Sequence, residues 1–283
     1  MADKLTVPDL HARVAEGTPL SMITCYDYPM ARMIDRAGVD IVLVGDSVAM
    51  TVLGYPNTLS ATMDMMVVFA RAVARGCERA FVLGDMPYMS YQASVSEAIH
   101  NAGRFMAESG VDGVKLEGGR GMVDAVHGIV RAGVPVMGHL GLTPQSASMI
   151  GGYKVQARSG DAAIALLEDA LALQDAGVFA ILLELVPARV AEVITRKVGV
   201  PTISIGSGGA CSGQCQILHD AIGMFEAFTP RHAKRYAEVG STIREAMEQF
   251  VADIQSHAYP GPEHSFRVSS EALRQLQEYA ETR

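Results

Sequence analysis

Asp40-Ile-Val-Leu-Val-Gly-Asp-Ser47 is a short apolar run that ends in a glycine, a carboxylate and a hydroxyl. Four consecutive apolar residues, three of them β-branched, predict a strand that is buried on both faces, as strands of parallel sheets are. An acid at the C-terminal tip of such a strand is a common active-site element in α/β proteins. Taken alone, however, Asp46 fits a turn cap better than a catalytic residue.

The same design recurs along the chain, because strands with polar tips alternate with segments of helical periodicity. The predicted strands cover residues 21–27, 40–47, 81–87, 113–119, 134–139, 179–186, 200–206 and 217–223. Helices are predicted between and around them, over residues 5–16, 29–37, 63–75, 94–109, 122–132, 161–176, 188–197, 232–256 and 270–281. Residues 140–160 are predicted to form a long irregular loop, which is typical of a functional segment.

Eight strands alternating with helices predict a parallel sheet, since each connection is long enough to hold a crossover helix. Eight such units favour a closed (β/α)8 barrel over an open doubly wound sheet. The chain also lacks a Gly-x-Gly-x-x-Gly fingerprint after its first strand and has no P-loop. We therefore expect one domain over 1–283, with an N-terminal helix, a barrel over roughly 20–256 and a C-terminal helical extension over 257–283.

Composition narrows the possible classes of protein. A hydrophobic content of 49% with 19% charged residues is enough for a sizeable core. The net charge of −8 disfavours nucleic acid as a partner, and no apolar run is long enough to span a membrane. The N-terminus lacks the apolar segment of a signal peptide, so we expect a cytoplasmic protein with reduced, mostly buried thiols at Cys25, Cys77, Cys211 and Cys215.

In a barrel the strand tips share one face, where active sites lie. The polar side chains at or near predicted tips are Asp27, Asp46, Asp85, Glu117, His139 and Glu184, with Lys115 two residues before Glu117. Five carboxylates at one mouth repel one another unless a cation or protons compensate, which predicts a divalent metal. Carboxylate oxygens suit Mg²⁺ or Mn²⁺, and Asp46 and Asp85 are the strongest candidate ligands.

A metal with open coordination positions can chelate an α-keto acid and stabilise the enolate formed from it. That chemistry needs a base, and Glu184 suits the role because its chain neighbours are apolar. Lys115 would supply positive charge for the substrate carboxylate or the enolate oxygen. His139 would either donate a hydrogen bond to the reacting groups or serve as a structural residue, and the two interpretations are equally good.

Over residues 22–266 the sequence resembles the ketopantoate hydroxymethyltransferase family. The order and spacing of specific motifs carry this resemblance: Thr24-Cys-Tyr-Asp27, Val44-Gly-Asp-Ser47, Gly84-Asp-Met-Pro87, Val114-Lys-Leu-Glu-Gly-Gly119, Gly138-His-Leu-Gly-Leu-Thr-Pro-Gln145, Gly151-Gly-Tyr-Lys-Val-Gln156, and Glu184 before Val186-Pro187.

The resemblance implies a barrel of the phosphoenolpyruvate mutase/isocitrate lyase type. It implies transfer of a one-carbon unit from 5,10-methylenetetrahydrofolate to 3-methyl-2-oxobutanoate, with one Mg²⁺ per subunit, to give 2-dehydropantoate for pantothenate and coenzyme A biosynthesis. It also implies a homo-oligomer, commonly a decamer. Carried over by motif, Mg²⁺ is held by Asp46, Asp85 and Glu117, the keto acid contacts Asp46, Ser47, Asp85 and Lys115, and the proton acceptor is Glu184.

One departure from the family pattern stands at Ser212, where an aspartate is usual. We expect it to affect local loop structure or contacts with the folate, and not the metal site. Two alternatives remain beside the transferase: another Mg²⁺-dependent α-keto-acid carbon–carbon lyase with the same barrel, and a non-catalytic paralogue, which Ser212 motivates. Retention of every metal and base position argues against the paralogue.

Overall fold

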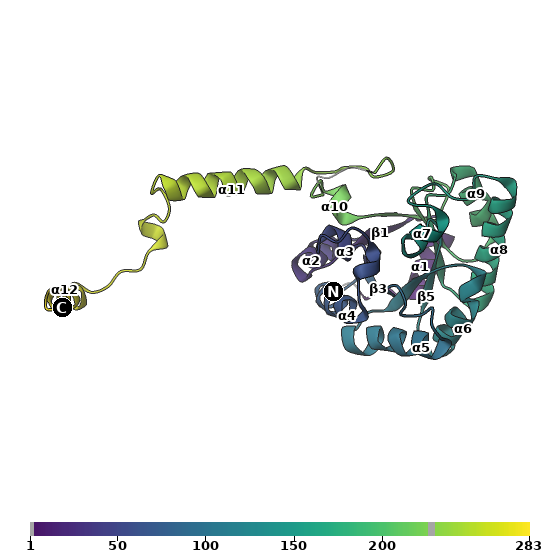
Figure 1. The fold of residues 1–283 in the computed structure, drawn as a ribbon, viewed down its shortest axis with the longest axis horizontal. Helices are drawn as coiled ribbons and strands as arrows, with labels where there is room; N and C mark the ends of the chain where they lie inside the picture. Colours follow the sequence, from purple (N-terminus) through teal and green to yellow (C-terminus); the bar gives the residue numbers. More distant parts are fainter. Residues whose placement is uncertain (1–2, 226–229) are drawn as a thin grey trace.

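The computed structural model describes residues 3–225 and 230–283. Residues 1–2 and 226–229 lie outside the described residues. All six belong to the expected domain 1–283, and residues 226–229 also belong to the expected barrel span 20–256. Eight parallel strands in the described part close into a barrel in sequence order, with β1 beside β8 (Figure 1). The strands are β1 (Leu20–Thr24), β2 (Ile41–Val44), β3 (Phe81–Asp85), β4 (Gly113–Glu117), β5 (Val136–Gly141), β6 (Ala180–Glu184), β7 (Thr202–Ile205) and β8 (Gly213–Gln216). The predicted (β/α)8 fold is confirmed.

Helices surround the barrel, and side-chain caps start several of them. Thr62, Ser94 and Ser159 each accept a hydrogen bond from the backbone N–H three residues on. The helices on and around the barrel are α1 (Val7–Ala15), α2 (Tyr28–Arg36), α3 (Val48–Thr51), α4 (Met63–Gly76), α5 (Val95–Arg104), α6 (Val123–Arg131), α7 (Ala147–Ile150), α8 (Gly160–Ala176), α9 (Ala188–Lys197) and α10 (Leu218–Ala221).

The N-terminal end of the barrel is closed by α1. Leu10 of this helix is fully buried and belongs to the same apolar cluster as the side chains inside the barrel, among them Ile41, Leu43, Phe81, Leu83, Met137, Leu182 and Ile203. The ring of His11 contacts the carbonyl oxygen of Phe179 at 2.8 Å and fastens the helix there. The opposite, C-terminal end is therefore the one left open for a ligand.

The last strand differs from the prediction. The sequence predicted it over residues 217–223, whereas β8 runs from Gly213 to Gln216 and pairs with β1 and β7. Residues 217–223 instead contain α10. The apolar pair Ile217-Leu218 suggested a strand, but barrel closure selects Gly213, where a Cβ would collide with the backbone and side chain of Leu20.

Three further segments differ in detail from the sequence-based expectations. The predicted helix 232–256 begins only at Val239, as α11 (Val239–Gln255). The expected irregular loop 140–160 contains a 3₁₀ turn at Pro144–Ser146 followed by α7. Helix α5 ends at Arg104 and continues as a π-helical turn over Phe105–Ser109.

The C-terminal part of the chain extends away from the barrel (Figure 1). Neither α11 nor α12 (Ser270–Glu281) contains a buried residue. None of the described helices is long and apolar enough to cross a lipid bilayer. The domain spans 1–283 and 20–256 stay predictions.

Candidate active site

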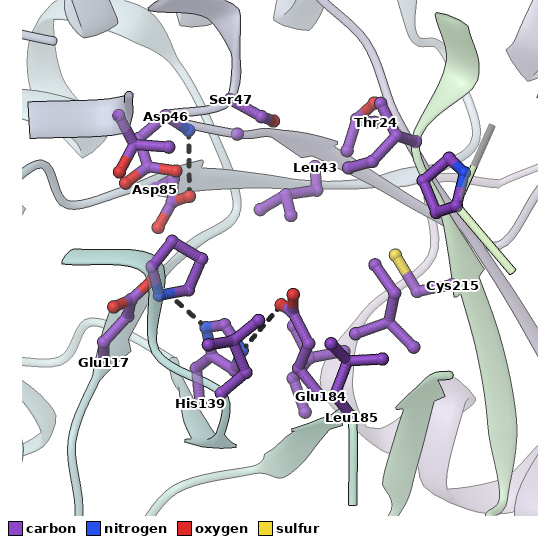
Figure 2. A pocket seen from close by; sticks show the side chains of 18 of the residues that line it. Thr24, Leu43, Asp46, Ser47, Asp85, Glu117, His139, Glu184, Leu185 and Cys215 are labelled. Carbon is purple, nitrogen blue, oxygen red and sulfur yellow. Dashed lines mark hydrogen bonds and ion pairs between the residues drawn. The ribbon is translucent and has the colours of Figure 1, made fainter. Parts of the chain in front are cut away.

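A cavity of about 530 Å³ lies at the C-terminal ends of the strands. Strands β3 to β6 and the residues directly after β2 place polar side chains in its wall. Figure 2 shows several of these side chains converging on one space. The predicted site residues that line it are Asp46, Ser47, Asp85, Lys115, Glu117, His139 and Glu184. Asp27 is the exception, because its exposed side chain caps α2 by accepting a hydrogen bond from Met30 N at 2.8 Å.

Strand register explains why these groups meet. Lys115 and Glu117 are two residues apart on β4, so their side chains leave the same face of the strand. Asp85 on β3 is the register partner of Lys115, and His139 on β5 is the partner of Glu117. Four charged or titratable side chains therefore lie close together on three adjacent strands.

Asp46 and Asp85 form a buried acid pair. The backbone N of Asp46 donates to Asp85 Oδ2 at 2.9 Å (Figure 2), and both side chains are almost inaccessible. Burial raises the pKa of Asp46 well above its usual range, and the negative charges of Asp85 and Glu117 raise it further. The pKa of Asp85 is also raised, chiefly by burial, although Lys115 opposes this. In the absence of a further cation, the surroundings of the pair therefore favour its protonated forms.

Lys115 is the principal cation beside this pair. Its Nζ lies 2.8 Å from Asp85 Oδ1 and 4.0 Å from Glu117 Oε1. Burial alone would lower the pKa of this amine, but the neighbouring carboxylates of Asp85, Glu117 and Asp46 outweigh it and raise the pKa. Lys115 is therefore an ammonium at neutral pH, and one such charge cannot neutralise several carboxylates.

His139 connects the two sides of the cavity. Its Nδ1 lies 3.4 Å from Glu117 Oε1, and its Nε2 lies 3.2 Å from Glu184 Oε2 (Figure 2). Burial and the Lys115 ammonium, 3.2 Å from Nδ1, lower the pKa of His139, but the two carboxylates outweigh them and raise it to about 9. A protonated ring attracts both carboxylates, so His139 lies between Glu117 and Glu184 as a positive charge.

Gln145 is a residue of the site to which the sequence analysis assigned no role. Its side-chain Nε2 donates to Asp46 Oδ2 and to Met86 O, each at 3.0 Å. Its backbone N donates to Glu117 Oε2 at 3.0 Å, and its Oε1 accepts from the Tyr91 hydroxyl at 2.8 Å. One buried residue thus holds both carboxylates, Asp46 through its side chain and Glu117 through its backbone. The available signal was its position in Thr143-Pro-Gln145, directly after a predicted strand tip.

Ser212 lies at the other end of the barrel. Its Oγ accepts a hydrogen bond from Thr202 N at 3.2 Å, and its carbonyl oxygen accepts from Leu20 N at 2.9 Å. These residues begin β7 and β1, at the strand ends opposite the cavity. The departure from the family pattern therefore bears on local structure, and Ser212 does not line the site.

The side chains present fit a magnesium ion of ordinary coordination. Within residues 3–225 and 230–283, no cluster of three or more His, Cys, Asp or Glu groups is close enough to enclose a metal. Mg²⁺ typically takes only one or two carboxylates and keeps several waters. Asp46 and Asp85 supply such a pair, and Glu117 Oε1 is a buried oxygen without a hydrogen-bond donor. The oxygen donors and the excess negative charge both suit this ion.

Known structures with the same architecture share little sequence with this chain. Phosphonopyruvate hydrolase superposes with a TM-score of 0.63 at 11% identity, covering 98% of this chain and 97% of that one. A 2,3-dimethylmalate lyase described as a phosphoenolpyruvate mutase/isocitrate lyase superfamily member gives 0.57 at 14% identity, covering 98% of both chains. At such identities the likeness establishes the type of barrel.

Sequence relatives are much more similar. The family model for ketopantoate hydroxymethyltransferase matches residues 4–262. The 3-methyl-2-oxobutanoate hydroxymethyltransferase of Heliobacterium modesticaldum is 46% identical, over 96% of this chain and 98% of its own length. The protein of the same name from Carboxydothermus hydrogenoformans is 48% identical, over 97% and 99%. This chain therefore belongs to the ketopantoate hydroxymethyltransferase family of enzymes.

Proposed function

We propose that this enzyme transfers a hydroxymethyl group from 5,10-methylenetetrahydrofolate to 3-methyl-2-oxobutanoate and forms 2-dehydropantoate on the route to pantothenate and coenzyme A. The observation that carries the proposal is the arrangement across the cavity: Glu184 faces the space beside the Asp46–Asp85 pair and Lys115. A base opposite a cation-binding acid pair is what enolate formation from a keto acid requires.

Asp46, Asp85 and Glu117 would hold one Mg²⁺ per subunit, directly or through water. When bound, the ion would act as a Lewis acid that polarises the keto group. Asp46 and Asp85 would also lie against the keto acid. Two carboxylates beside an anionic substrate are favourable only with a cation between them, so substrate and metal sites are expected to overlap.

Lys115 and Ser47 would orient the keto acid. The Lys115 ammonium is held rigidly by Asp85 at 2.8 Å and can donate to the substrate carboxylate or to the oxygen that gains charge. The Ser47 hydroxyl lines the same cavity and is positioned by a 2.8 Å hydrogen bond with the Tyr26 hydroxyl. These groups fix the plane of the substrate and so the direction of its C3–H bond.

Glu184 would accept the proton from C3 of the keto acid. Its side chain is 16% exposed, stands at the tip of β6 and is oriented by His139 at 3.2 Å. The C3 carbon, once deprotonated, would attack the one-carbon unit of the folate; water would supply the hydroxyl oxygen and tetrahydrofolate would be released. His139 would act here by holding the Glu184 carboxylate in one orientation.

The test is a product assay with purified enzyme, 3-methyl-2-oxobutanoate, Mg²⁺ and 5,10-methylenetetrahydrofolate. We expect 2-dehydropantoate only when all components are present, and loss of product after chelation of the metal. Exchange of the C3 proton with deuterium, followed by NMR without folate, reports proton abstraction alone. Absence of both exchange and product from folded enzyme would overturn the proposal.

The alternative chemistry is a carbon–carbon lyase acting on a related α-keto acid. The same metal, lysine and base positions would serve it, and it needs no folate. Incubation of the keto acid with and without folate separates the two, because a lyase would release fragments in the folate-free reaction.

A non-catalytic paralogue has less support. Ser212, which motivated it, lies at the opposite end of the barrel from the cavity, and every predicted metal, substrate and base position lines that cavity. Normal metal binding without any turnover would revive this alternative.

We propose further that the enzyme is a homo-oligomer, with the decamer implied by family resemblance as the specific expectation. Helix α11 supports an assembly, because one face of it exposes the apolar side chains of Ile243, Met247, Phe250, Val251 and Ile254. A contiguous exposed apolar face marks an interaction surface. A cytoplasmic location is proposed with it, supported by four buried cysteines that form no disulfide.

A further inference from the structure

The cavity has two unlike halves. Figure 2 shows Asp46, Asp85 and Glu117 on one side, and Thr24, Cys215 and Leu185 on the other. The second half is lined mainly by apolar side chains from β7, β8 and the neighbouring segments, including Leu185, Ile205, Cys215 and Ile217. A cavity of about 530 Å³ is far larger than a small branched keto acid requires. The apolar half is therefore space for a second molecule.

Asp220 is a buried carboxylate in the wall of this apolar half. It is only 8% exposed and lines the cavity. Within the part of the chain that the structure describes, its carboxylate has neither a hydrogen bond nor an ion pair. Burial raises its pKa, which the more distant charges of His232 and Arg235 oppose. The Asp220 side chain lines a ligand cavity and has no partner among the described residues, so its position points to a partner supplied by the ligand.

The local structure holds Asp220 firmly in this place. Helix α10 begins directly after β8, and the Leu218 N at its start donates to the Thr24 hydroxyl of β1 at 3.0 Å. The ring of His219 packs against that of Tyr26, with centroids 5.4 Å apart. Asp220 is therefore attached to the barrel wall by the two residues that precede it, and does not stand on a free loop.

The residues around Asp220 define the shape and charge of the group that fits. Leu185, Ile205 and Ile217 offer apolar surface for a ring. Arg231 lines the same cavity, is exposed, and has no ion pair with any described residue. A matching ligand has a planar or near-planar ring, two adjacent N–H donors on one edge, and negative charge farther away.

We propose that Asp220 binds the amino-oxo-pyrimidine edge of a reduced pterin, with the pterin ring in the apolar half and its acidic tail toward Arg231. This ring presents an endocyclic N–H beside an exocyclic amino group. One carboxylate accepts from both, as it does from the paired N–H groups of a guanidinium. The inference rests on the proposed function, since it assigns a subsite to the folate donor of that reaction.

The position of this subsite is consistent with group transfer. Ile205 of the apolar half is the register partner of Glu184, the proposed base. A pterin anchored at Asp220 and extending over Ile205 therefore approaches the carbon from which Glu184 removes a proton. The keto acid and the folate would occupy adjoining parts of one cavity.

The test compares wild type with Asp220→Asn, which keeps the size of the side chain but places an amide against the donor edge of the ring. Tetrahydrofolate binding is measured by calorimetry in the presence of Mg²⁺ and keto acid. We expect the Kd to rise about 10- to 100-fold, the effect of losing charge-assisted hydrogen bonds. Folate-independent exchange of the C3 proton is expected to stay within about twofold of wild type.

Two controls accompany the variant. Asp220→Glu keeps the carboxylate and is expected to bind tetrahydrofolate better than Asp220→Asn. Asp161→Asn removes an exposed carboxylate in the first turn of α8, which does not line the cavity, and is expected to change neither measurement.

The outcomes separate this inference from the proposed function. Unchanged tetrahydrofolate affinity in Asp220→Asn, with normal wild-type turnover, overturns only the Asp220 assignment. Loss of proton exchange in Asp220→Asn also overturns it, because Asp220 would then serve the fold or the keto-acid half. A wild-type enzyme that exchanges the proton but does not bind tetrahydrofolate overturns the folate donor, and this subsite with it.

Discussion

Glu184 is the proposed proton acceptor of the reaction. Glu184→Gln keeps the shape of the residue and a contact to His139 but removes the proton acceptor. We expect C3 exchange to fall by roughly 10²- to 10⁴-fold, the usual effect of removing a general base, with keto-acid affinity largely kept. NMR exchange and calorimetry measure the two quantities. Wild-type exchange in this variant would mean that another group is the base.

Gln145 is expected to be a positioning residue for the metal site. Its amide links Asp46 Oδ2, Met86 O and the Tyr91 hydroxyl inside the protein. Gln145→Ala frees the Asp46 carboxylate and should weaken Mg²⁺ binding about 10- to 100-fold, as loss of groups that orient metal ligands does. Calorimetric titration with Mg²⁺, without substrate, gives the measurement.

The matched control for that variant is Gln214→Ala, which removes an exposed amide that donates to the Gly208 carbonyl oxygen. Equal Mg²⁺ affinities for wild type and Gln145→Ala would show that the Asp46 orientation does not depend on this amide. Thermal melting of each protein checks that the fold is retained.

At the residue scale, sequence patterns predicted most of the polar side chains that line the cavity, but not the contacts between them. Asp46, Asp85 and Glu184 were recognisable because strand tips are local features of the chain. Asp27 stands at an equally good tip, yet it caps α2 instead of facing the cavity. Gln145 could not be assigned, since its partners are distant in sequence and meet only when the loop after β5 folds over the barrel mouth.

Among the elements, β3 shows how closely strands and helices pack. A Cβ on Gly84 would collide with the ring of Phe105, in the π-helical turn that follows α5. We expect Gly84→Ala to destabilise the protein by about 2 kcal/mol, which is roughly 4–8 °C in Tm, because overpacking forces side chains and backbone apart. Differential scanning calorimetry provides the comparison.

Gly103 supplies the control for that prediction. It lies in α5, and a Cβ there would meet nothing within 4 Å. Gly103→Ala is expected to leave Tm unchanged or to raise it slightly, because alanine favours helix. A Gly84→Ala protein as stable as Gly103→Ala would show that Phe105 can move aside at no cost.

Helices and strands could be predicted from the sequence where the local pattern was strong. Helix α5 begins at the capping serine that the sequence indicated, since a cap involves groups only three residues apart. The position of the eighth strand was not predicted correctly, because Gly213–Gln216 is short and half polar. Its strand character comes from pairing with β1, which lies nearly two hundred residues earlier and is a property of the closed barrel.

For the whole molecule, the exposed apolar face of α11 predicts how a substitution changes the oligomeric state. Val251 lies on the exposed apolar face of this helix, whereas Ala252 lies on the other side. Val251→Glu would place a charge in the proposed subunit interface and should shift the protein toward smaller species. Light scattering after size-exclusion chromatography, at equal protein concentrations, measures the mass.

Ala252→Glu adds the same charge outside that face and is expected to keep the wild-type mass. A wild-type protein that is monomeric at the concentrations used would contradict the proposed assembly. Unchanged mass in Val251→Glu would show that this face of α11 is not the interface.

Across the molecule, the number and order of strands, the acidic strand tips and the position of the proposed base could be predicted from the chain alone. They depend on hydrophobic periodicity and turn chemistry, which act over a few residues. The register that sets Lys115 between Asp85 and Glu117, the amide of Gln145 beneath Asp46, and the unpaired Asp220 in an apolar wall were not readable. These features depend on residues that are far apart in sequence. Such residues come close together only when β8 pairs with β1 and the barrel closes.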